Sequence, residues 1–274
     1  MSPDGSPAGG APAAVHRSYD PVYFAPLFAA EDRHFWFRAR NRAIAALVRQ
    51  VTAPLAAGHR VLEVGCGTGN VLRMLEQLCP HGTVVGMDLL ADGLRYARQR
   101  TRCALVQGDL HMPPFRAPFD VIGVFDVLEH FADDRQVLSD LHRMLVPGGA
   151  LLVTVPAHPW LWSYFDEAGH HRRRYERAEL CGKLVDCGFR IEYHSEYLAS
   201  ILPLVWLRRW RSRLPRARRV AESDRTYALA TDELRIVPGL NALFAAVLSA
   251  EARLIARRRA LPIGTAILAL ARRA

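Results

Sequence analysis

The sequence predicts an α/β fold built on a doubly wound, mainly parallel sheet. Five short apolar runs alternate with segments of helical period, and the runs are apolar nearly throughout, as in strands covered on both faces. The runs lie at 60–65, 83–88, 103–109, 119–126 and 150–156, and the helical segments at 70–79, 91–100 and 133–145. Such alternation implies right-handed crossovers between parallel strands. A glycine-rich turn also follows the first run directly, in VLEVGCGTGN at 61–70.

Further elements flank this alternation on both sides. Before the first strand, Ile44, Leu47, Val48 and Val51 recur at the spacing of an amphipathic helix. After the fifth strand, 176–187 is typical of a helix that ends at a glycine, and FRIEYHSEY at 189–197 is typical of a strand. A last strand is expected within LPIGTAILALARR at 261–273.

The domain organisation follows from where the alternation of strands and helices stops. Residues 1–17 are rich in Pro, Gly and Ala and are expected to form a disordered tail. Residues 18–274 are interpreted as one domain, because the chain is long enough for one large core. Segment 198–261 departs from the strand–helix pattern, and we expect it to form a helical cap insertion between the last two strands.

The composition limits the kinds of molecule that the protein is expected to bind. The formal charge is +9, but Lys183 is the only lysine and the basic residues concentrate after Arg208, away from the glycine turn. We therefore expect no nucleic-acid binding. The five cysteines form no CxxC pair and no metal-ligand spacing, which favours free thiols in a reducing, intracellular compartment.

The apolar segments indicate at most a peripheral relation to membranes. The runs near 240–250 and 261–271 are shorter than the roughly 20 residues that a spanning helix needs, and no signal sequence is present. A cytoplasmic protein is expected. Segment 198–219 mixes Leu202, Trp206 and several arginines, which suits either a solvated face of a cap helix or a helix lying peripherally on the inner face of the membrane.

Acidic residues accompany the glycine turn. The spacing Gly65-x-Gly67-x-Gly69 differs from that of dinucleotide sites, and Glu63 two residues earlier would repel a pyrophosphate. Asp88 ends the next strand, where a carboxylate can accept hydrogen bonds from ribose hydroxyls, and Asp109 ends the third. With no lysine nearby for phosphates, the pattern indicates a nucleoside cofactor without phosphates.

In that order and spacing, VLEVGCGTGN, GMDLL, VQGDLHMPPF, FDVIGVFDVLEH and LVPGGALLVTVP resemble the class I S-adenosylmethionine-dependent methyltransferases over about residues 58–197. The resemblance implies a Rossmann-like sheet of seven strands whose last strand is antiparallel and lies beside the fifth. It also implies S-adenosyl-L-methionine as cofactor. The cofactor-binding positions that it implies are Glu63, Gly65, Cys66, Gly67, Gly69, Asp88, Leu89, Asp109, Leu110, Phe125 and Asp126.

The segment PAHPWLWSYFDEAGHHRRRY at 156–175 is expected to bind the acceptor, because ligands of such sheets lie beyond the carboxyl ends of the strands. It resembles a bacterial subgroup with LWS…D…H-x-R-R-Y after the fifth strand and FWF before the first. The candidate substrate-binding residues are Trp36, His158, Trp162, Tyr164, His170, Arg173, Arg174 and Tyr175. The tryptophans equally suit packing on the sheet edge.

Two histidines are candidate catalytic bases, because a histidine takes up a proton near neutral pH. They are His171 and His130, and Glu129 is expected to brace the turn after the fourth strand. We expect no metal, since His130, His170 and His171 lack a recognisable ligand spacing. Arg173 or Arg174 is expected to hold an acidic group of the acceptor.

The sequence thus predicts a methyltransferase acting on a small-molecule or lipid-like acceptor, at oxygen. Two alternatives remain open at this point. One is an NAD(P)-dependent oxidoreductase on a similar sheet, and the other is a non-catalytic cofactor-binding partner subunit.

Overall fold

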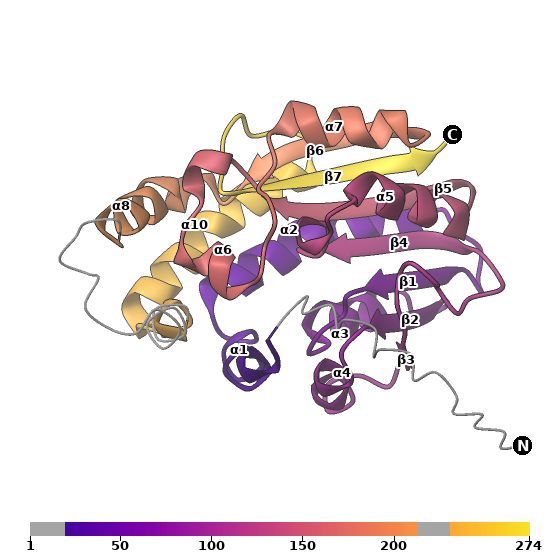
Figure 1. Cartoon of the computed structure of the whole chain (residues 1–274), viewed down its shortest axis with the longest axis horizontal. Helices are drawn as coiled ribbons and strands as arrows, with labels where there is room; N and C mark the ends of the chain where they lie inside the picture. The colour runs from indigo at the N-terminus through magenta and orange to yellow at the C-terminus, as the bar shows by residue number, and fades with distance from the viewer. Residues whose placement is uncertain (1–19, 213–230) are drawn as a thin grey trace, which may run out of the picture.

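The computed structural model describes residues 20–212 and 231–274, and its centre is a seven-stranded sheet with the order β3-β2-β1-β4-β5-β7-β6 (Figure 1). The strands are β1 (Arg60–Val64), β2 (Thr83–Asp88), β3 (Ala104–Gln107), β4 (Phe119–Phe125), β5 (Leu145–Pro156), β6 (Phe189–Tyr197) and β7 (Ala266–Arg273). Strands β1 to β5 pair in parallel, whereas β7 is antiparallel to both of its neighbours, β5 and β6. This confirms the predicted fold class and the place of the last strand.

Helices cover both faces of the sheet. They are α1 (Phe24–Ala30), α2 (Phe35–Thr52), α3 (Asn70–Leu78), α4 (Ala91–Ala97), α5 (Asp134–Met144), α6 (Tyr164–Ala168), α7 (Arg177–Asp186), α8 (Leu202–Ser212) and α10 (Pro238–Ala256). The apolar faces of α2, α3 and α10 form one half of the core, and those of α5 and α7 form the other. Cys66, Cys79 and Cys103 are free thiols buried in the first half.

Segment 198–261 lies between β6 and β7, and its described parts form helices. Helix α10 packs along α2, where Arg42 Nη1 donates to the Ala245 carbonyl at 3.2 Å and Gln50 Nε2 donates to the Ala256 carbonyl at 2.8 Å. The carboxylate of Glu251 accepts hydrogen bonds from the backbone of Ala199 and Ser200. The expected tail at 1–17 and the basic stretch at 213–219 fall outside the described residues.

Helix α10 corrects the expectation about apolar length. Its 19 residues are long and apolar enough to cross a membrane by length and composition, although the apolar run in the sequence is shorter. Because a helix packed on a core passes the same test, this property alone does not define a membrane span. Its outward face still exposes Leu240, Leu243 and Val247.

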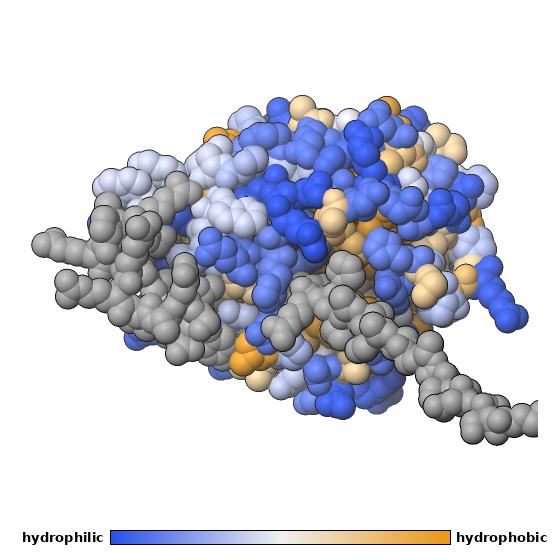
Figure 2. All heavy atoms as spheres, in the orientation of Figure 1, coloured by the Kyte–Doolittle hydropathy of each residue, from blue (hydrophilic) through white to orange (hydrophobic). Residues whose placement is uncertain are grey.

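The carboxyl ends of the parallel strands point toward α1 and α6, and this edge of the sheet carries the candidate site (Figure 1). Figure 2 shows that the surface seen from the same direction is mostly hydrophilic, with scattered apolar residues, one group of them near α1.

Candidate active site at the carboxyl edge of the sheet

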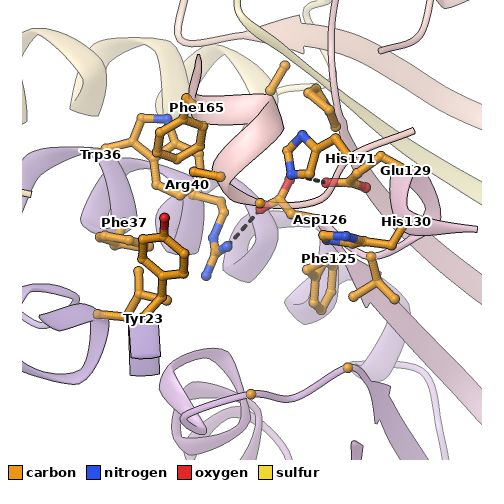
Figure 3. A pocket seen from close by; sticks show the side chains of 18 of the residues that line it. Tyr23, Trp36, Phe37, Arg40, Phe125, Asp126, Glu129, His130, Phe165 and His171 are labelled. Atoms are coloured by element: carbon orange, nitrogen blue, oxygen red, sulfur yellow. Dashed lines mark hydrogen bonds and ion pairs between the residues drawn. The ribbon is translucent and has the colours of Figure 1, made fainter. Parts of the chain in front are cut away.

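A cleft of about 1260 Å³ opens where β1, β2 and β4 end. The sheet edge forms its floor, while side chains of the 3-10 turn η1 (Pro21–Tyr23), α1, α2, α6 and α10 surround it. Among them are Tyr23, Trp36, Phe37 and Phe165 (Figure 3), and Phe244 of α10. Pockets for one drug-sized ligand measure roughly 300–1,000 Å³. The cleft therefore has room for a cofactor and a second molecule.

The glycine turn contributes bare main chain to this cleft. Gly65, Gly67 and Gly69 have φ of +69°, +48° and +77°, which favours glycine at all three positions. A Cβ on Gly65 would lie 2.4 Å from the side chain of Val127, whereas one on Gly67 would meet nothing within 4 Å. Gly65 and Gly67 line the cleft. Gly69 does not; it is the N-cap directly before α3, and a Cβ on it would lie 2.9 Å from Ala97 of α4.

Three acidic residues lie near the carboxyl ends of β1, β2 and β3, in different environments. The Asp88 carboxylate accepts hydrogen bonds from the backbone N–H of Gly67 at 2.7 Å and of Leu90 at 2.8 Å. Asp109 is exposed and accepts from the backbone N–H of His111. Glu63 is buried, its Oε2 has no hydrogen-bond partner among the described residues, and burial raises its pKa well above the usual value.

An ion pair that the sequence did not suggest lies on the cleft floor. Arg40 of α2 donates from Nη1 to Asp126 Oδ2 at 2.7 Å, and its guanidinium lies 5.2 Å from the ring centre of Trp36 (Figure 3). Thr154 Oγ1 donates to the other Asp126 oxygen at 3.1 Å. Asp126 is thus held by protein groups. Arg40 lies on an amphipathic helix, and nothing in the sequence around it indicates a role in the site. Its ion pair with Asp126 in the folded chain is what assigns it to the site.

His130, His171 and Glu129 lie together on the opposite wall (Figure 3). The ring of His171 is hydrogen-bonded through Nδ1 to Asp166 Oδ1 at 3.0 Å, and its Nε2 is 3.8 Å from Glu129 Oε1. The rings of His130 and His171 meet edge to face, with centroids 4.9 Å apart. Burial, and then the neighbouring His171, lower the pKa of His130 to about 3.

Glu129 does not brace the turn by hydrogen bonding, which corrects the expectation for this residue. It is fully buried, and neither carboxylate oxygen has a hydrogen-bond partner among residues 20–212 and 231–274. Burial, reinforced by the nearby charge of Asp126, raises the pKa of Glu129 well above the usual value.

Several candidate acceptor residues do not face the cleft, because other parts of the chain satisfy them. The Tyr175 side chain is fully buried and its hydroxyl donates to Asp134 at 2.8 Å. Arg173 also pairs with Asp134, and His158 Nε2 lies 2.8 Å from Glu196. These residues hold the loop 156–175 in place. The expectation that Tyr175, Arg173 and His158 contact the acceptor is therefore wrong.

Of the other residues of that loop, some bond to the rest of the protein and some line the cleft. Arg174 reaches the cleft wall, but its Nε donates to Asp166 at 2.7 Å and its Nη1 to the Ala157 carbonyl. Tyr164 does not line the cleft, and its hydroxyl donates at 2.5 Å to Glu233, which does. Trp36, Trp162 and His170 do line the cleft.

The sheet order, the glycine turn and the acids at the strand ends together define a nucleoside-binding α/β protein. Residues 35–194 match the methyltransferase domain family, and because this is more than half of the chain, the protein belongs to that family. By family it is an S-adenosylmethionine-dependent methyltransferase, which settles the choice against the oxidoreductase.

The relatives show how far this likeness extends. A probable S-adenosylmethionine-dependent methyltransferase of Mycolicibacterium smegmatis is 31% identical over 62% of this chain and 67% of its own length. The trans-aconitate 2-methyltransferase of an Azoarcus species is 35% identical over 53% of this chain and 55% of its own length. The chain thus spans about half the length of that second relative.

A solved structure agrees with the fold and with nothing more specific. The [4+2]-cyclase SpnF superposes with a TM-score of 0.53 and 19% identity, covering 85% of this chain and 81% of that protein. At this identity the likeness shows the fold alone, and the name of that enzyme illustrates that the fold does not fix the reaction.

The residues present fit the cofactor. Glu63 offers a buried oxygen without a partner, Gly67 leaves open space over the main chain, and Asp88 offers a carboxylate at the end of β2. An unpartnered buried acid suits an ammonium group, a bare turn suits close approach, and a strand-end acid suits ribose hydroxyls. No lysine lies in the cleft, which agrees with a cofactor that has no phosphates.

Proposed function

We propose that the protein transfers the methyl group to an oxygen atom of a small, uncharged and largely apolar acceptor. The proposal rests on one observation, which is whether the arginines that line the cleft already have carboxylate partners. Arg40, Arg174, Arg208 and Arg209 all have carboxylate partners from the chain itself. The two others, Arg172 and Arg235, are solvent-exposed, where an ion pair with an acidic acceptor contributes little.

The rest of the lining supports an apolar acceptor. Aromatic side chains surround the cleft, and such rings bury apolar ligand surface efficiently. A carboxylate-rich acceptor such as trans-aconitate, named for one relative, needs cations that are not already neutralised. We therefore propose that this chain binds a different acceptor, with Trp36, Trp162 and His170 at its contact surface.

We propose the following division of labour for the cofactor residues. Glu63 binds the ammonium group, Gly65, Cys66 and Gly67 let the methionine part approach the main chain, and Asp88 binds the ribose. Leu89, Asp109 and Leu110 contact the adenine, while Phe125 and Asp126 line the end of β4. When bound, the cofactor supplies an electrophilic methyl group on a sulfonium.

The chain itself positions the acceptor, excludes water and receives a proton. An acceptor hydroxyl must lose that proton, and His130 and His171 are the titratable groups on the wall beside Asp126. Of the two, His171 is the better base, because Asp166 fixes its Nδ1 and orients its ring. The low pKa of His130 makes it a weak base at neutral pH.

We also propose that the acceptor reaches the cleft from an apolar surface. The walls continue into α8 and α10, whose outer faces expose Trp206, Trp210, Leu240 and Leu243. Lipid-like acceptors are concentrated at such surfaces, and an apolar face beside the opening would let one pass without full hydration.

The test is a methyl-transfer assay with a panel of acceptors, followed by mass spectrometry. The panel contains phenols and quinols with apolar tails, the matching amines, and trans-aconitate. We expect products only from the hydroxyl acceptors. Transfer confined to amines or to trans-aconitate contradicts the proposal. At saturating cofactor, His171→Ala should lower turnover by about 10²–10⁴-fold, whereas His142→Ala, on α5, serves as the control histidine.

A further inference from the structure

Glu129, His130 and His171 form a compact cluster at the wall of the cleft, which we call the EHH cluster. Each offers one ligand atom, and these atoms all lie within 4.8 Å of one another. Glu129 and His130 belong to the 3-10 turn η2 (Leu128–His130) directly after β4, and His171 belongs to the loop after α6 (Figure 3). Two separate segments therefore bring the three ligand atoms together.

The state of Glu129 points to a missing cation. A buried carboxylate is normally paired, hydrogen-bonded or bound to a metal, because the free ion is costly in a medium of low polarity. Two other acids near Glu129 have arginine partners, Arg40 for Asp126 and Arg174 for Asp166. Glu129 has neither an arginine partner nor a hydrogen bond from the described residues, and His171 Nε2 lies 3.8 Å from its Oε1.

The surroundings of His171 are those of a metal ligand. Its Nδ1 bonds to Asp166 Oδ1 at 3.0 Å, which assigns the proton to Nδ1 and leaves the lone pair of Nε2 toward Glu129. Metal-bound histidines commonly donate their second ring N–H to a carboxylate, which fixes the tautomer and the ring plane. Asp166 is itself fixed by Arg174 and by the backbone N–H of Ser163 at 2.8 Å.

We propose that the EHH cluster binds a divalent transition-metal ion. Two imidazole nitrogens and one carboxylate oxygen suit Zn²⁺, Fe²⁺, Mn²⁺ or Co²⁺, whereas Mg²⁺ and Ca²⁺ prefer oxygen ligands alone. Metal–ligand distances of about 2.0–2.2 Å require the three atoms to close to roughly 3–3.5 Å. Three protein ligands leave an open position on the side of the cleft.

A cation bound by the EHH cluster would activate the acceptor hydroxyl, and this step rests on the proposed O-methylation. An acceptor hydroxyl at the open position becomes more acidic, so its O–H bond breaks and the proton passes to water in the cleft. The acceptor oxygen then forms the O–CH₃ bond while the S–CH₃ bond breaks and leaves a neutral thioether. When the cation is bound, the two histidines act as its ligands, and the cation replaces His171 as the group that promotes loss of the acceptor proton.

Cobalt binding tests the site without any acceptor. Untagged protein is treated with a chelator and titrated with Co²⁺, and visible absorption and calorimetry are recorded. We expect one site per chain, with Co²⁺ displaced by Zn²⁺ but not by Mg²⁺. Glu129→Gln and His171→Gln should each weaken binding more than the roughly 100-fold loss seen when an outer-shell partner is removed. His170→Gln, at the exposed histidine next in sequence, should leave the Co²⁺ titration unchanged.

The outcomes separate the metal site from the proposed reaction. Glu129→Gln breaks no hydrogen bond of the described structure, so the variant should fold, and its thermal unfolding checks this. An absent Co²⁺ band in the wild type, or an unchanged band in the folded Glu129→Gln variant, overturns the metal site. Binding of S-adenosylhomocysteine by the same chelator-treated sample shows that the cofactor site is intact. Metal binding without O-methylation of any panel acceptor overturns the proposed reaction alone.

Discussion

Two glutamates, Glu63 and Glu129, lie in the same cleft, and burial makes the charged form of both carboxylates unfavourable. Both are inaccessible, and for both burial is the largest cause that raises the pKa. Such groups are tolerated where a ligand provides the missing charge, and for this reason they mark functional sites. In the protein without ligands they have a measurable consequence for stability.

The contribution of Glu63 and Glu129 to the free energy of unfolding should fall as the pH rises above about 4.5, the ordinary pKa of glutamate. Above that pH the unfolded chain has lost protons that the folded chain keeps on Glu63 and Glu129. The stability that these protons confer is complete at lower pH and is lost as the pH rises toward the folded pKa values. Each group contributes a slope of up to about 1.4 kcal/mol per pH unit.

Urea unfolding of chelator-treated protein between pH 4.5 and pH 8 measures this slope. Glu63→Gln and Glu129→Gln should each make the profile flatter and raise stability at pH 8. Glu167→Gln, at an exposed glutamate of α6, is the control and should leave the profile as it is. Profiles for both buried-site variants that run parallel to the wild type would show that neither glutamate keeps its proton in the folded state.

Asp88 should determine the affinity for the cofactor. Its carboxylate already accepts hydrogen bonds from Gly67 and Leu90, so both the turn and the acid are ordered before a ribose arrives. A hydrogen bond to a charged group contributes roughly 1.5–3 kcal/mol. Asp88→Asn should therefore weaken S-adenosylhomocysteine binding by on the order of 10–100-fold in calorimetry. Asp92→Asn, at a surface acid paired with Arg95, should bind like the wild type.

At the level of elements, the start of α3 depends on Gly69. Its φ is +77°, and a Cβ would lie 2.9 Å from the backbone of Ala97 in α4, so any side chain meets both strain and a fixed neighbour. Gly182 is the opposite case, since it lies inside α7 with nothing within 4 Å of a Cβ. The same substitution should thus have opposite effects at the two positions.

Gly69→Ala should destabilise the protein by about 1–3 kcal/mol, the usual cost of a strained backbone position. Gly182→Ala should stabilise it by about 0.5–1 kcal/mol, because alanine restricts the unfolded chain and favours helix. Urea unfolding measures both changes. A loss of stability at Gly182, or none at Gly69, would contradict the packing described for these helices.

The long elements were predictable from sequence, and two short helices were not. Strands β1, β2 and β4 are continuous apolar runs, and α2 repeats its apolar residues at helical spacing over 18 residues. Helix α1 has only seven residues and α6 only five, too few to establish a period. Both border the cleft, so the walls were harder to predict than the floor.

The site was predictable where function depends on the backbone, and less so where it depends on pairing. The glycine turn and Asp88 lie at fixed offsets from strands, so their positions follow from the sheet. The roles of Tyr175 and Arg173 depend on Asp134, about 40 residues away, which the sequence does not connect to them. Arg40 was missed for the same reason, since Asp126 is its partner only in the folded chain.

At the scale of the whole molecule, the N-terminal helix α2 and the late helix α10 form one layer on the sheet. Phe35 donates from its backbone N–H to Asn241 Oδ1 at 2.7 Å, and its ring lies 5.1 Å from that of Phe244. These contacts lie on the wall of the cleft. A molecule that contacts the outer faces of α8 and α10 would therefore also touch the entrance to the site.

The proposed apolar entrance predicts vesicle binding by the intact chain. The protein should sediment with anionic vesicles at low salt, because exposed tryptophans insert at the interface and neighbouring arginines attract anionic headgroups. Trp206→Gln combined with Trp210→Gln should reduce the bound fraction severalfold, since the two indoles stack on the exposed face of α8. Met112→Gln removes a more exposed apolar side chain, 80% accessible and located after β3, and should leave binding unchanged. Sedimentation that is absent at low salt, or equal in all three proteins, would mean that the acceptor enters the cleft from solution.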